Sequence, residues 1–137
     1  MTLKELSQLY YLNREIENDC RRLEELEAKI VSPSSPNLSG MPRSTAYGNK
    51  IESSVADIID LKAIIAAKQQ QCIYERSRLM RYITEIDDSL TREIFIFRFV
   101  NGLSWRQVAA SVGGNNTADS CRMTCKRYLE ACKKQEK

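Results

Sequence analysis

The stretch EIFIFRFVNGLSWRQVAASVGGNNTADSCRMTCKRYL, residues 93–129, decides how this chain folds. Two short Gly/Asn interruptions, at 101–102 and 113–116, divide it into three segments with helical periodicity. The last segment is rich in Arg and Lys. We therefore predict a support helix, a short second helix and a basic third helix, the arrangement of a helix-turn-helix unit.

The ends of the first two helices can be placed by their capping residues. Asn101-Gly102 closes the support helix as a left-handed C-terminal cap, and Ser104 is the N-cap of a short helix over 105–112. Val108 and Ala109 are expected to face inward, followed by Gly113 in the turn. The support helix is predicted to bury one apolar face formed by Leu90, Ile94, Phe97 and Val100.

Burial decides where the third helix begins. If Asn115 capped it, Asp119 and Arg122 would have to enter the core, which is costly. If Thr117 caps it, Asp119 lies in the first turn, where the helix dipole favours a negative charge. We therefore predict a recognition helix over 118–132. Its inward residues are then Cys121, Cys125, Tyr128 and Cys132.

Outward side chains around this turn are candidate contacts to DNA. Arg122 and Lys126 can hydrogen-bond guanine O6 and N7 or phosphate, Arg127 suits phosphate, and Met123 can touch a thymine methyl. A solvated arginine on a helix surface is the alternative for each residue taken singly. The predicted DNA-binding set is Arg106, Gln107, Asn115, Asn116, Thr117, Ser120, Arg122, Met123, Lys126 and Arg127.

The charge distribution agrees with such a surface. The whole chain carries 21 basic and 18 acidic residues, a net charge of +3. Up to Thr91 there are 12 basic and 14 acidic residues (12 − 14 = −2), and from Arg92 onward 9 and 4 (9 − 4 = +5). A positive sector on an otherwise balanced chain is typical of a nucleic-acid contact surface.

Composition argues against several other classes of protein. Histidine is absent, which removes the commonest general base and zinc ligand, so we expect no enzyme, no metal site and no cofactor. The five cysteines are an odd number without a CxxC pair, which favours reduced, packed thiols. No apolar run is long enough to cross a membrane, and the charged N-terminus is unlike a signal peptide. We therefore expect a cytoplasmic protein.

The first half of the chain has heptad periodicity. Apolar residues recur from Leu9 to Ile30, although Asp19 occupies one core position with Cys20 beside it, and again from Ile51 to Ile86. The connector 32–49 holds all three prolines and cannot continue a helix. We predict an all-α fold in which residues 1–86 form a long antiparallel helical hairpin and residues 87–137 a helix-turn-helix domain. The hairpin either closes on itself or, since its second helix has a broad apolar stripe, pairs two copies into a homodimer.

Two families resemble this chain. REIFIFRFVNGLSWRQVAASVG, from Arg92, is similar to the start of region 4 of bacterial sigma-70 factors. The helical first half, the connector SPSSPNLSGMPRS and the block RFVNGLSWRQVAASVGGNNTADSCRM together resemble small phage and prophage regulators of the RinA and ArpU type. The turn here is about two residues longer than the sigma pattern, because Gly114, Asn115 and Asn116 precede Thr117.

The resemblance implies a sequence-specific regulator of late or packaging genes in a bacterial host. Its partners would be double-stranded DNA and host RNA polymerase. The alternative from another class is a protein-interaction adaptor that uses the helical rod and does not bind DNA. Salt-dependent binding to DNA separates the two, because neutralising phosphates releases counterions.

Overall fold

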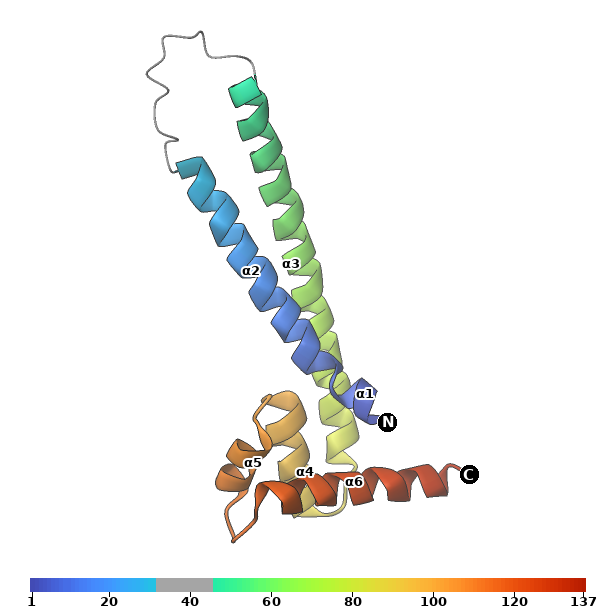
Figure 1. Cartoon of the computed structure of the whole chain (residues 1–137). Helices are drawn as coiled ribbons and strands as arrows, with labels where there is room; N and C mark the ends of the chain where they lie inside the picture. The colour runs from blue at the N-terminus through green and yellow to red at the C-terminus, as the bar shows by residue number, and fades with distance from the viewer. Residues whose placement is uncertain (32–45) are drawn as a thin grey trace. The chain divides into compact units, whose positions relative to one another are not determined.

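The computed structural model describes residues 1–31 and 46–137, and every regular element in those ranges is helical, which confirms the all-α class (Figure 1). No helix in them is both long and apolar enough to cross a membrane. The elements are α1 (Leu3–Leu6), α2 (Gln8–Val31), α3 (Ala46–Thr84), α4 (Ser89–Phe95), the π-helical turn η1 (Ile96–Val100), α5 (Trp105–Val112) and α6 (Ala118–Gln135).

The chain divides into two compact units, and the division differs from the predicted one at residue 86. The terminal unit comprises Met1–Asn13 and Gln71–Lys137, and the central unit comprises Arg14–Gln70. The first residues of the chain belong with the last ones because Leu6 and Leu9 are buried in the same cluster as Phe95 and Leu129. Local periodicity does not indicate that these distant segments pack against each other.

The central unit is an antiparallel pair formed by parts of α2 and α3. Three ion pairs connect them: Glu27 to Lys62 at 3.5 Å, Asp19 to Lys68 at 2.6 Å and Glu15 to Lys68 at 3.4 Å. Residues nearer the start of α2 pair with residues nearer the end of α3, as an antiparallel arrangement requires. The predicted connector 32–49 lies outside the described residues, except for its last four positions, which are already the first turn of α3.

Asp19, which interrupts the apolar stripe of α2, has a partner on α3. Lys68 follows the buried Leu61 by one heptad, so it occupies a core-type position of α3. Its Nζ donates to Asp19 Oδ2 at 2.6 Å, and this hydrogen bond is the main cause that raises the pKa of Lys68. A single polar pair within an apolar seam can fix the register of two helices.

We expect Asp19→Asn to lower the thermal stability of the protein more than Glu15→Gln does. Both substitutions remove one negative charge, but the Asp19 carboxylate lies closer to Lys68 Nζ than that of Glu15 does. Because the pKa of Lys68 is raised on folding, the pair stabilises the fold at neutral pH and loses this effect as the pH rises through that raised pKa. Thermal unfolding of both variants at neutral and high pH checks the order. Equal losses would contradict it.

The predicted support helix, formed by α4 and η1, is buried on two sides. This corrects the prediction of a single buried face. Leu90 is 37% exposed, whereas Ile94, Phe95 and Phe99 are all buried. Ile94 lies in a cluster with residues of α5 and α6, while Phe95 and Phe99 lie in another with α1 and α3. The π-helical turn η1, with the Asn101 N–H donating to the Ile96 carbonyl at 2.9 Å, widens the spiral. A periodicity of 3.6 residues per turn therefore does not predict which residues of this segment are buried.

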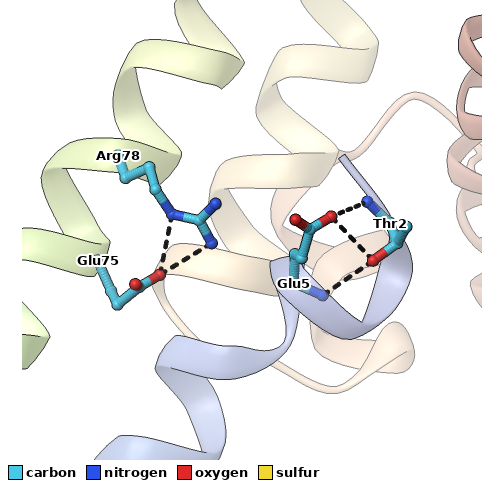
Figure 2. A network of polar contacts seen from close by, with 4 residues as sticks. All are labelled: Thr2, Glu5, Glu75 and Arg78. Carbon is cyan, nitrogen blue, oxygen red and sulfur yellow. Dashed lines mark hydrogen bonds and ion pairs between the residues drawn. The ribbon is translucent and has the colours of Figure 1, made fainter. Parts of the chain in front are cut away.

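A capping box holds the N-terminus of α1 in place. The Thr2 backbone N–H donates to Glu5 Oε2 at 2.7 Å, and the Glu5 N–H donates to Thr2 Oγ1. The hydrogen bonds from Thr2 lower the pKa of Glu5, and Arg78 makes a smaller contribution. Figure 2 shows the Arg78 guanidinium on α3 bound to Glu75 through two nitrogens, at 3.1 and 3.0 Å. The capping box stabilises the short helix α1, which carries the buried Leu6.

Candidate nucleic-acid interface

Helix α5 begins at Trp105 with Ser104 as its N-cap, as predicted. The Gln107 N–H donates to Ser104 Oγ, and the Ser104 N–H donates to Gln107 Oε1 at 2.9 Å, so the two residues form a capping box. Leu103 and Val108 pack in the same cluster, as a hydrophobic staple requires. The side chain of Gln107 is therefore engaged in capping, while Arg106 is exposed at the start of the helix.

The turn between α5 and α6 has backbone angles that favour glycine and asparagine. Gly113, Gly114 and Asn115 have φ of 70°, 63° and 63°. Asn115 is the only residue other than glycine with positive φ in the described ranges, and its side chain is exposed. The Asn116 Nδ2 donates to the Gly113 carbonyl at 2.8 Å. Of the two predicted asparagine contacts, Asn115 is available and Asn116 closes the turn.

Helix α6 begins after Thr117, which confirms the choice made from burial. The Ser120 N–H donates to Thr117 Oγ1 at 3.1 Å, and the Thr117 N–H donates to Ser120 Oγ at 2.9 Å. Such a cap stabilises a helix by about 1 kcal/mol. Thr117 and Ser120 are thus occupied at the helix N-terminus. α6 continues to Gln135, three residues beyond the predicted end.

The inner side of α6 is held by Cys121, Cys125 and Leu129, all buried. Tyr128 and Cys132, which were predicted to face inward, are half-buried, and Leu129 was not among the predicted inward residues. Its spacing of four residues from Cys125 is the signal that could have found it. Burial raises the pKa of the Cys125 thiol to about 11, so this thiol stays protonated at neutral pH. Cys125 therefore acts as an apolar residue.

The predicted contact residues of α6 do not all share one face. Met123 and Arg127 lie opposite the buried side, because each is two residues, or about 200°, from a buried cysteine. Arg122 and Lys126 lie on one flank, about 60–100° from Cys125. All four are exposed. Arg122 also binds the Asp119 carboxylate at 3.0 Å, whereas Lys126 and Arg127 have no ion pair in the described part of the chain.

The flank with Arg122 and Lys126 borders a groove that sequence reasoning missed. Its volume is about 550 Å³, and it lies within the terminal unit. Its apolar lining comes from α1, α2, η1, α5 and α6, namely Leu3, Tyr11, Phe99, Trp105, Cys125 and Leu129. Its charged lining consists of Arg98, Arg122, Lys126, Lys133 and Glu130. We call this feature the basic groove.

Arg98 links the groove to the start of α5. Its guanidinium lies 4.7 Å from the centre of the Trp105 ring, a cation–π contact, and its Nη1 donates to the Leu103 carbonyl at 2.8 Å. These contacts hold the loop before α5 against η1. Arg98 therefore positions Trp105 beside α6.

Comparison of the chain with known protein families, with curated proteins and with solved structures found no match.

Proposed function

We propose that this protein is a sequence-specific DNA-binding transcriptional regulator that places α6 in the major groove. The observation that carries the proposal is the capped, exposed α6, which follows α5 after a short turn and presents Met123, Lys126 and Arg127 to solvent. An α-helix fits the major groove, and its cations can bind guanine edges and phosphates. The resemblance to phage regulators of the RinA and ArpU type supports a role in late or packaging genes, within the bacterial host cytoplasm.

We propose different roles for the candidate contacts. Arg127 and Met123 face away from the core and would enter the major groove of DNA. Lys126 would reach the bases or the phosphates from the flank of α6. Arg106 and Asn115, both exposed near the turn, would contact the DNA backbone. Gln107, Asn116, Thr117 and Ser120 support the fold of the site through capping and turn hydrogen bonds.

The proposed regulator is a homodimer that reads two half-sites, because one small helix-turn-helix unit binds weakly. Support comes from the part of α3 in the central unit, where Val55, Ile59 and Ala66 follow helical spacing and are exposed, Ile59 by 62%. A second copy of this stripe is the proposed partner. By the resemblance to sigma region 4, host RNA polymerase is a further proposed partner.

Selection of bound DNA from a random pool, using the full chain, tests the proposal. We expect enrichment of one motif, present as two half-sites, and an affinity that falls steeply with salt because bound phosphates release counterions. Light scattering at tens of micromolar should return the mass of a dimer. A pool without an enriched motif, together with binding that is insensitive to salt, would refute DNA recognition. A monomer mass would refute the homodimer alone.

A further inference from the structure

We propose that the basic groove is a docking site for an acidic amphipathic helix of a partner protein. The groove lies within the terminal unit and is formed where the first residues of the chain meet α5 and α6. Its combination of apolar floor and cationic rim differs from what phosphate binding alone requires. The proposal does not depend on DNA binding by α6.

The apolar lining is open to solvent at its outer edge. Leu3 on α1 and Tyr11 on α2 are 56% and 62% exposed, and both line the groove together with the half-buried Trp105. Large apolar side chains that stay exposed next to one another in a concave site mark a contact surface. They would hold the apolar face of a partner helix, as in other helix-in-groove complexes.

The charged rim selects the partner by electrostatic complementarity. Arg122, Lys126 and Lys133 follow one another along the same flank of α6, and Arg98 adds a fourth cation from η1. Among the described residues that line the groove, Glu130 is the single carboxylate. Lys126 and Lys133 have no ion-pair partner within residues 1–31 and 46–137. Asp119 partly neutralises Arg122, but the rim keeps a net positive charge, which favours a partner helix with several Asp or Glu residues.

The dimensions agree with one short helix. From Arg122 to Lys133, the flank extends over about three turns of α6, or about 17 Å. A partner helix of that length presents anchors at positions i, i+4 and i+7. The volume of about 550 Å³ lies within the usual range of pockets that hold a few apolar groups.

One consequence rests on the proposed function. Lys126 belongs both to the rim of the basic groove and to the proposed DNA-binding set. A bound acidic helix would neutralise this cation and present its own carboxylates to the phosphates. The partner and DNA would therefore exclude each other, so the partner would act as an inhibitor of DNA binding.

The test is a selection of helical peptides of about 16 residues from a random library on the full chain. We expect enriched peptides with net negative charge and with Leu, Phe or Trp at helical spacing. Trp105 is the only tryptophan of the chain and lines the groove, so saturation with a synthetic copy of an enriched, tryptophan-free peptide should change its fluorescence. Unchanged Trp105 fluorescence, or enriched peptides without acidic residues, would overturn the proposal.

A double variant locates the binding site without touching the proposed DNA contacts. Tyr11→Ser with Lys133→Glu should weaken peptide binding about tenfold or more, because it removes an aromatic anchor and reverses a rim charge. The matched control is Tyr74→Ser with Lys29→Glu, which makes the same chemical changes at exposed residues outside the groove; Tyr74 is 62% exposed, as is Tyr11. Equal affinities for both double variants would also overturn the proposal. DNA affinity, measured in parallel, reports on the proposed function separately.

Discussion

Replacing Lys126 and Arg127 together by alanine should weaken specific DNA binding by at least about 30-fold, since each cation that contacts a base or phosphate contributes about 1–3 kcal/mol. Both side chains are exposed on α6, and neither has an ion pair in the described part of the chain. They can therefore bind DNA without first breaking an internal contact. Fluorescence anisotropy with the selected motif, at several salt concentrations, measures the loss and the expected decrease of the salt slope.

Arg122 offers a comparison on the same helix. Its guanidinium binds Asp119 at 3.0 Å, so DNA must compete with a local carboxylate. Arg122→Ala should therefore weaken binding less than Arg127→Ala does, and Asp119→Ala should strengthen binding of the otherwise unchanged chain. The spacing of three residues between Asp119 and Arg122 allows this ion pair, and the structure shows that it forms.

The matched control for the double variant is Arg21→Ala with Arg22→Ala. Both arginines are exposed on α2 in the central unit, and their removal changes the net charge of the chain by the same amount. We expect this control to bind DNA nearly as the unaltered chain does. If the two double variants lose equal affinity, binding depends on total charge and not on α6. If neither loses affinity, α6 is not the DNA-binding helix.

Leu6→Ala should lower the free energy of unfolding by about 2–5 kcal/mol, which is the usual cost of removing a fully buried leucine side chain. Leu6 is completely buried, in a cluster with Leu79, Ile83 and Phe95. The loss is a large fraction of the stability of a typical domain, about 5–15 kcal/mol. Chemical denaturation followed by circular dichroism measures it.

Leu3→Ala in the same short helix is the control for Leu6→Ala. Leu3 is 56% exposed, so its replacement should change the free energy of unfolding by no more than about 0.5 kcal/mol. Similar effects of the two substitutions would contradict the burial of α1 in the terminal unit. A large effect of Leu6→Ala alone would show that the first residues of the chain stabilise the unit that contains α6.

Local features of the candidate site could be predicted because their interactions lie within a few residues. Ser104 and Thr117 each cap a helix through a residue three positions ahead, and Gly102 and Gly113 supply positive φ. These preferences depend on the residue and its immediate neighbours. The helices α5 and α6 and the turn between them therefore followed from the sequence, as did the all-α class.

Two predicted DNA contacts, Gln107 and Ser120, bind within the protein instead, and each lies three residues after an N-cap, which is the spacing of a capping box. Gln107 and Ser120 suit DNA contact by residue type, yet their side chains accept hydrogen bonds from backbone N–H groups at the start of α5 and α6. Asp19 and Lys68 of the central unit also bind each other. Each is a polar residue in an apolar stripe, and the ion pair between them accounts for both.

The sequence by itself determined the helical class, the ends of α5 and α6, and a basic surface on α6, since periodicity, capping and charge are local properties of the chain. Tertiary structure decided which apolar faces meet. It buried Leu6, near the start of the chain, with Leu129, near its end. It also divided the buried residues of the segment 89–100 between two clusters. It also formed the basic groove from α1, α2, η1, α5 and α6. Apolar burial is non-directional, so a periodic pattern shows that a face is buried without showing which segment covers it.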